Sequence, residues 1–81
     1  MDNFKTVLTI NEYGKVNIRL KELLESKNIT RNYLSRASYT RFEVINKWYH
    51  NEVEKLDLDI LARICYVLDC SPADIIKYEQ R

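Results

Sequence analysis

The chain has 81 residues, a length that corresponds to a single domain. Its 46% hydrophobic and 31% charged residues are typical of a globular protein. One glycine and one proline leave little material for tight hairpins or glycine-rich phosphate loops, so an all-β fold is excluded. The net charge of +1 hides an asymmetry, because residues 13–50 sum to +5 and residues 51–81 to −3. This asymmetry favours a surface that faces a polyanion; the alternative is a set of solvated helix faces.

Residues 1–14 are predicted to form an N-terminal arm that is separate from a domain over residues 15–81. Residues 4–10 (FKTVLTI) are rich in β-branched side chains and have a period of two, in which Phe4, Thr6, Leu8 and Ile10 alternate with Lys5, Val7 and Thr9. This pattern predicts a short strand. No other segment reads as a strand, so the arm has no partner within the chain. It is either a solvated tail or the element that pairs two chains in a homodimer.

Three helices are expected in the first half of the domain. Apolar residues from Val16 to Leu24 recur at helical spacing and predict a helix over residues 16–28. Thr30 then offers a cap for a short second helix over residues 31–37. Thr40 and Glu43 match a capping box, with Tyr39 and Val44 placed for a hydrophobic staple, and they predict a third helix over residues 41–50.

The third helix divides into an apolar and a polar side. Ile45 and Trp48 are predicted to be core residues that hold the helix onto its neighbours. Four polar residues follow one another at helical spacing on the outward side: Glu43, Asn46, Lys47 and His50. A fourth helix is expected from Asp57 or Leu58, and a fifth from the cap Ser71-Pro72, which would bury Ile75 and Ile76. The predicted fold class is therefore all-α, with five helices and a short extended arm.

The second and third helices, joined by a turn of about three residues, form a helix-turn-helix, a motif whose second helix can enter the major groove of DNA. The segment over residues 30–51 (TRNYLSRASYTRFEVINKWYHN) resembles the helix-turn-helix of the Cro/CI-type (Xre-like) bacterial and phage repressors. Residues 56–76 (LDLDILARICYVLDCSPADII) look like the fourth and fifth helices of that family. In this resemblance Leu34, Ile45 and Trp48 match buried positions. The resemblance implies a sequence-specific, double-stranded DNA-binding transcriptional regulator that reads the groove with residues 41–50.

The same resemblance implies which side chains touch DNA. Base-reading positions carried over from the family, with Asn46 added from the polar side of the helix, are Arg41, Phe42, Glu43, Asn46 and Lys47. Positions that match phosphate contacts of the family are Arg31, His50, Asn51 and Lys55. Arginine and lysine suit guanine, asparagine suits adenine, glutamate suits cytosine and phenylalanine can touch a thymine methyl. Two alternatives stay open: Glu43 as a capping acid and Phe42 as a core residue.

Three positions depart from the family pattern. Tyr39 stands where glycine is usual, and because a bulky residue at positive φ is costly, we expect a different backbone in this turn. Ser35 replaces the usual alanine. Asn51 replaces a glycine after the third helix, which is a mild change because asparagine tolerates the left-handed conformation.

Other kinds of function have little support in the sequence. Two cysteines, Cys65 and Cys70, and a lone His50 have no recognised metal-ligand spacing, so we expect small buried thiols in a reducing compartment, no metal and no cofactor. No nucleophile–base pair or paired carboxylates indicate an enzyme. The chain shows no signal peptide or apolar run long enough to span a membrane, so a cytoplasmic location is expected.

Two functional classes remain: the DNA-binding regulator and a helical protein-interaction module, such as an antitoxin-like or adaptor partner. A DNA binder should lose affinity steeply as salt rises, whereas an interaction module should ignore duplex DNA. Five aromatic residues could form a stacking platform for single strands, but their helical spacing favours core packing: Tyr33, Tyr39, Trp48, Tyr49 and Tyr66.

Overall fold

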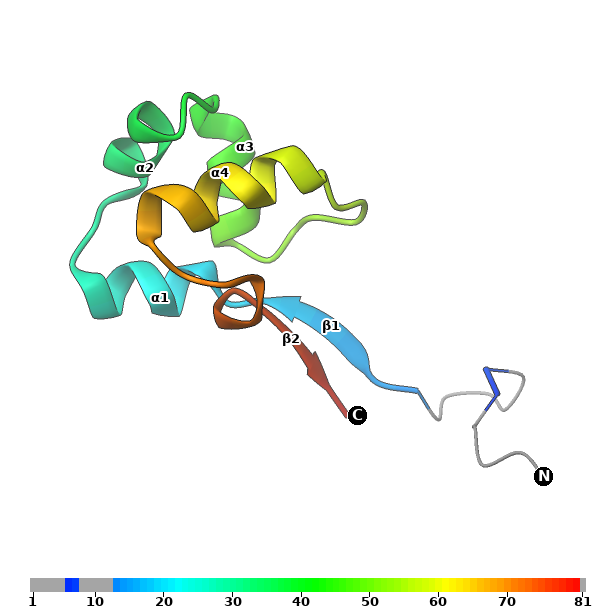
Figure 1. Ribbon diagram of the computed structural model, residues 1–81. Helices are drawn as coiled ribbons and strands as arrows, with labels where there is room; N and C mark the ends of the chain where they lie inside the picture. Colours follow the sequence, from blue (N-terminus) through cyan, green and yellow to red (C-terminus); the bar gives the residue numbers. More distant parts are fainter. Residues whose placement is uncertain (1–5, 8–12, 81) are drawn as a thin grey trace.

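Four α-helices and a two-stranded ribbon make up the part of the chain that the computed structural model describes, which is residues 6–7 and 13–80. In chain order the elements are β1 (Lys15–Ile18), α1 (Leu20–Lys27), α2 (Arg31–Ala37), α3 (Phe42–Tyr49), α4 (Leu58–Leu68), the 3-10 turn η1 (Pro72–Asp74) and β2 (Ile76–Glu79). Figure 1 shows the helices gathered together and the β1–β2 ribbon leading away from them. None of the described helices has the length and apolar character needed to cross a membrane.

The core lies between the four helices and the base of the ribbon. Its largest fully buried side chains are Trp48, Leu20, Leu24, Leu34, Ile45, Ile64 and Ile75. Helix α2 contacts both α3 and α4, and α1 contacts α3. The prediction that Ile45 and Trp48 are core residues is confirmed, since they are 0% and 1% exposed. These two residues fix which side of α3 faces solvent.

Two predicted helix starts are correct, and a side chain caps each of these helices. The hydroxyl oxygen of Thr30 accepts a hydrogen bond from the backbone N–H of Tyr33 at 3.0 Å and begins α2. The carboxylate of Asp57 accepts hydrogen bonds from the backbone N–H groups of Asp59 and Ile60 at 2.9 and 3.2 Å and begins α4. In both cases the capping residue directly precedes its helix, so the start of the helix can be predicted from neighbouring residues alone.

The prediction of five helices is wrong at both ends of the domain. The first helix begins at Leu20 and not at residue 16, because residues 15–18 form β1. The expected fifth helix is only the 3-10 turn η1, after which β2 pairs antiparallel with β1, matching Val16 with Tyr78 and Ile18 with Ile76. The domain thus has two strands that were not expected, and each finds its hydrogen-bond partner only at the other end of the domain.

The strand predicted over residues 4–10 lies mostly outside the described residues. Thr6 and Val7 are described and are not part of a strand.

The expected capping box and staple at the start of α3 are also wrong. Arg41 is the N-cap residue of α3 and makes no side-chain capping bond. Thr40 is buried, and its hydroxyl donates to the carbonyl of Ser38 at 3.1 Å. Ser35 explains the difference, because its hydroxyl donates to the carbonyl of Thr40 at 2.6 Å and holds that residue against α2. Tyr39 is 92% exposed and cannot form a staple.

The expectation that the aromatic residues pack in the core is correct for some of them and wrong for others. Trp48 is buried and Tyr49 is half-buried against the core. Tyr33, Tyr39 and Tyr66 are mostly exposed, because each lies off the buried side of its helix or in a turn.

Both cysteines are free thiols that pack against the core but are only half-buried, so the prediction of small buried thiols is correct in part. Burial, together with the neighbouring Cys65, raises the pKa of Cys70 to about 11. The thiol therefore stays protonated at neutral pH. Among the described residues no group of three or more histidine, cysteine or acidic side chains could hold a metal ion.

Candidate nucleic-acid interface

The turn between α2 and α3 sets the angle of the outward-facing helix. Tyr39 has φ = 57°, the left-handed conformation that glycine favours. The expectation of a different backbone here is therefore wrong. The backbone N–H of Tyr39 donates to the carbonyl of Arg36 at 3.2 Å, and that of Thr40 donates to Ser35 at 3.0 Å. The Tyr39 ring is 92% exposed, so the cost of this conformation lies in the contact between its own Cβ and backbone, and hydrogen bonds around the turn must offset it.

Helix α4 reinforces the turn from the other side. The guanidinium of Arg63 donates from Nη1 to the carbonyl oxygen of Tyr39 at 2.9 Å and from Nε contacts Asp59 at 3.0 Å. Asp59 lies one turn before Arg63 on α4, so it orients the guanidinium toward the turn. The helix-turn-helix angle is therefore held by hydrogen bonds and not by a glycine.

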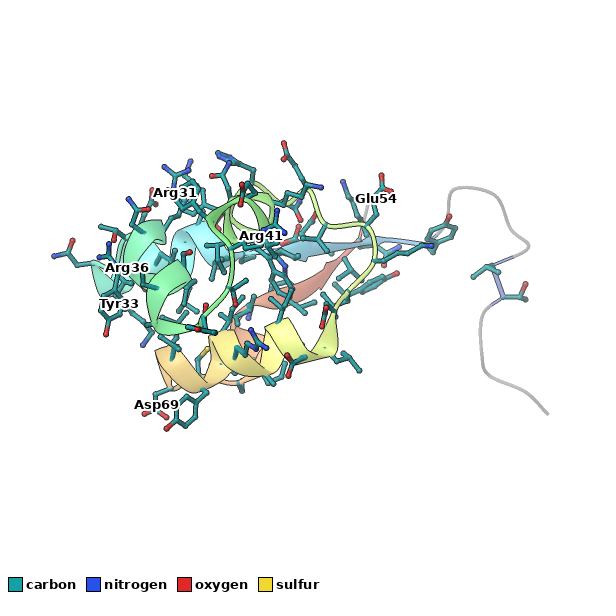
Figure 2. The ribbon with its side chains drawn as sticks, turned by 90° about the horizontal axis from the view of Figure 1, so that it is seen from above. Arg31, Tyr33, Arg36, Arg41, Glu54 and Asp69 are labelled. Atoms are coloured by element: carbon teal, nitrogen blue, oxygen red, sulfur yellow. The ribbon has the colours of Figure 1, made fainter. Side chains whose placement is uncertain are left out.

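The outward side of α3 carries polar and charged side chains. Arg41, Glu43, Lys47 and His50 are exposed, while Asn46 is half-buried. Arg41 and Glu43 approach within 3.9 Å, but both are more than 70% exposed, so this contact restrains them little. In Figure 2, seen from above, Arg41 lies over the middle of the helical part, with Arg31 and Arg36 at the α2 side. Glu54 lies on the opposite side, in the loop after α3.

A hollow lies between α3 and the loop that follows it. The charged residues that line it are Arg41, Glu43, Lys47, Glu52, Glu54, Lys55 and Asp57. This places Lys55 on the same side of the molecule as Arg41 and Lys47. The loop contributes the acidic side chains Glu52, Glu54 and Asp57 beside the basic Arg41 and Lys47. The positively charged surface of α3 therefore ends at this hollow.

Arg31 connects the start of α2 to the outward side of α3. Its Nη1 donates to Oδ1 of Asn46 at 2.6 Å. Its Cζ lies 4.3 Å from the ring centroid of Tyr49 and 5.9 Å from that of Phe42, distances at which a guanidinium is attracted to an aromatic face. Phe42 is 39% exposed, so it is neither a core residue nor fully free. Three predicted contact residues therefore form one cluster: Arg31, Phe42 and Asn46.

Asn51 attaches the end of α3 to the ribbon. It has φ = 57°, as its replacement of a glycine suggested. Its Oδ1 accepts from the backbone N–H of Ile18 at 2.8 Å, and its Nδ2 donates to Oδ1 of Asn17 at 2.9 Å. Both ends of the Asn51 amide are thus engaged by β1, which fixes the end of α3 relative to the strand.

Behind Asn51 the network continues across the ribbon. The amide of Asn17 donates to Glu79 at 2.5 Å, and Nη2 of Arg19 donates to the same carboxylate at 2.6 Å. Hydrogen bonds from Arg19 and Asn17 hold the pKa of Glu79 below its ordinary value. The carboxylate is therefore charged at neutral pH and joins β2 to β1.

Comparison with known proteins decides the class of this fold. The family described as the Cro/C1-type HTH DNA-binding domain matches residues 19–81, which is well over half of the chain. The chain belongs to this family. It is a family of DNA-binding domains and not of enzymes, and a search of curated proteins found no match to the chain.

Solved structures share the Cro/C1-type fold. A Bacteroides fragilis protein assigned as a candidate DNA-binding protein is similar with a TM-score of 0.68 and 24% identity, over 78% of this chain and 100% of that one. The transcriptional regulator VanUg is similar with a TM-score of 0.67 and 24% identity, over 95% of this chain and all of the other. At this level of identity the likeness concerns the fold.

Within the Cro/C1-type domain, the nine residues predicted to contact DNA lie on α2, on α3 and in the turn and loop segments next to α3. The structure leaves Arg41, Glu43, Lys47, His50 and Lys55 exposed, clusters Arg31, Phe42 and Asn46, and directs the amide of Asn51 to β1. Sequence reasoning missed Asn17, Arg63 and Glu79, which hold α3 in place. Their partners are 24 to 62 residues away in the chain, so no local spacing could have revealed them.

Proposed function

We propose that the protein is a sequence-specific transcriptional regulator that binds double-stranded DNA and reads the major groove with α3. The observation that carries this proposal is the division of α3 into two sides. Ile45 and Trp48 are fully buried, whereas Glu43 and Lys47 on the same helix and Arg41 at its N-cap are exposed. A helix held this firmly can present donors and acceptors to base edges without first becoming ordered.

Each exposed side chain has a role in this proposal. The base-reading group is Arg41, Phe42, Glu43, Asn46 and Lys47, and the phosphate-binding group is Arg31, His50 and Lys55. We assign Asn51, which the resemblance places among the phosphate contacts, to holding α3 instead. Its amide already has partners at both ends in β1, so a phosphate contact would have to break one of them.

Lys47→Ala tests the groove assignment. If Lys47 reads a base, the variant should lose about 1 to 3 kcal/mol of binding free energy at the selected site. A duplex selected from a random pool would be titrated by fluorescence anisotropy at several salt concentrations. Lys77→Ala is a matched control, because Lys77 is an exposed lysine on β2. Equal affinities for both variants and the parent would refute the assignment.

The same titrations separate the proposal from its alternative. A regulator that neutralises several phosphates should show log K falling steeply and linearly with log salt. Absence of duplex binding at low salt would favour the helical protein-interaction module instead. A DNA-binding regulator acts in the compartment that holds the DNA, and we propose the cytoplasm.

We further propose that the regulator acts as a homodimer. Two copies would place two α3 helices on half-sites roughly 34 Å apart, a spacing that matches one turn of DNA. The arm over residues 1–14 is the proposed pairing element, although most of it lies outside the described residues. Sedimentation of the chain lacking residues 1–11 tests this, because an unchanged oligomeric state, monomer or dimer, would exclude the arm as the dimerising element.

A further inference from the structure

The contact between Arg31 and Asn46 determines which face of the Asn46 amide is available to DNA. The Nη1 atom of Arg31 lies 2.6 Å from Oδ1 of Asn46. A guanidinium has only donors, so the amide atom that it meets must be the carbonyl oxygen and not the NH₂ group. The Nδ2 donors of Asn46 therefore lie on the other branch of the amide, away from Arg31.

Arg31 is itself held in one position. Its guanidinium lies 4.3 Å from the ring centroid of Tyr49 and 5.9 Å from that of Phe42, both of which belong to α3. These contacts with aromatic rings and a short hydrogen bond from a charged donor restrict the side chain much more than solvent would. Arg31 and Asn46 are both half-buried, so the pair behaves as a preformed unit and not as two independent surface residues.

This arrangement changes the base that Asn46 suits. A free asparagine recognises adenine with both amide branches, because Oδ1 accepts from N6–H₂ while Nδ2 donates to N7. In the Arg31–Asn46 pair a cation already occupies one of the two lone pairs of Oδ1, and the remaining N–H groups of that guanidinium are donors as well. These donors would oppose the N6–H₂ donor of adenine, whereas N7 and O6 of guanine are both acceptors.

We infer that Arg31 is a specificity-determining residue that converts Asn46 into a donor-only reader, so that this pair selects guanine and not adenine. The inference rests on the proposed function, since it assumes that α3 lies in the major groove. It also gives Arg31 a role other than a phosphate contact. A phosphate contact strengthens all sequences equally, whereas a positioning residue alters the preference at one base pair.

The experiment is a site selection from random duplexes with the full chain and four variants. Asn46→Ala identifies the base pair that residue 46 reads, as the position where its preference disappears. Arg31→Ala removes the guanidinium, and Arg31→Met removes the donors while keeping an aliphatic stem over Tyr49, in case the alanine variant fails to fold. Arg36→Ala is the matched control, because Arg36 is an exposed arginine on the same helix.

At the identified position the parent should select guanine, and Arg31→Met should shift the guanine-to-adenine ratio toward adenine by roughly tenfold, the lower part of the range for a bidentate base contact. Arg36→Ala should leave this ratio unchanged. Selection of adenine by the parent would overturn the inference. It would also be overturned if Arg31→Met kept the guanine preference and only lowered affinity and the salt slope for all sequences.

Failure of the inference and failure of the proposed function give different results. If Lys47→Ala weakens binding and Asn46→Ala changes no base preference, α3 reads DNA but the Arg31–Asn46 pair does not. If no variant and no parent protein binds duplex DNA, the proposed function fails and the inference fails with it.

Discussion

Substitution of Asn51 measures how strongly the ribbon holds the end of α3. In Asn51→Ala the backbone N–H of Ile18 loses its acceptor and Oδ1 of Asn17 loses its donor. Two hydrogen bonds of about 1 kcal/mol each, plus up to 1 kcal/mol because alanine tolerates positive φ less well than asparagine, give a loss of about 2 to 3 kcal/mol. That is a large fraction of the stability of a small domain.

Two further variants separate the contributions. Asn51→Gly loses the same two hydrogen bonds but suits the φ of 57°, so its loss should be about 2 kcal/mol. Asn51→Asp keeps an acceptor for Ile18 but no donor for Asn17, and its expected loss is also about 1 kcal/mol. The predicted order of stability is therefore parent, then aspartate, then glycine, then alanine.

Urea unfolding followed by the fluorescence of Trp48 measures these differences, because Trp48 is the single tryptophan and is 1% exposed. An alanine variant as stable as the parent would refute the holding role. If, in addition, that variant bound all DNA sequences equally more weakly, Asn51 would be a phosphate contact after all.

Three other outcomes follow from the fold. Tyr39→Gly should raise the free energy of unfolding by about 0.5 to 1 kcal/mol, because positive φ costs tyrosine more than glycine loses in chain entropy. A lower urea midpoint for this variant would contradict the prediction. Trp48→Ala should cost about 3 to 5 kcal/mol and unfold most of the protein, so a native circular dichroism spectrum would be inconsistent with its core position. Because Arg19 and Asn17 lower the pKa of Glu79 from its ordinary value of 4.5, the stability that Glu79 contributes is present above that value and is lost as pH falls through the lower folded pKa. Glu79→Gln should flatten this part of the acid-unfolding curve, and identical curves would show that the contact with Arg19 contributes nothing.

Sequence patterns predicted the elements whose signals are local. Thr30 and Asp57 lie next to the helices that they cap, and the spacing of Ile45 and Trp48 reports the buried side of α3 directly. The ribbon escaped prediction because Val16 and Leu20 have helical spacing, while the strand that pairs with Val16 lies at residues 76–79.

The candidate site was predicted in outline, since the helix-turn-helix segment contains its own amphipathic pattern. Its supporting contacts were not predicted. The left-handed Tyr39 is stabilised in part by Arg63, which is 24 residues away, and the partner of Asn51 is on a strand that was expected to be helix. Long-range hydrogen bonds of this kind leave no periodic trace in the sequence.

The ribbon also orders the events of biosynthesis, because β1 is the first and β2 the last of the described elements to leave the ribosome. Helices α2 and α3 are neighbours in the chain and can pack soon after residue 50 has emerged. Strand β1 must wait as an unpaired edge until residues 76–79 have been made, and joining these distant segments is entropically expensive. The ribbon can thus close only after the helix-turn-helix has been made, and a nascent chain stopped before β2 would lack the strand that pairs with β1.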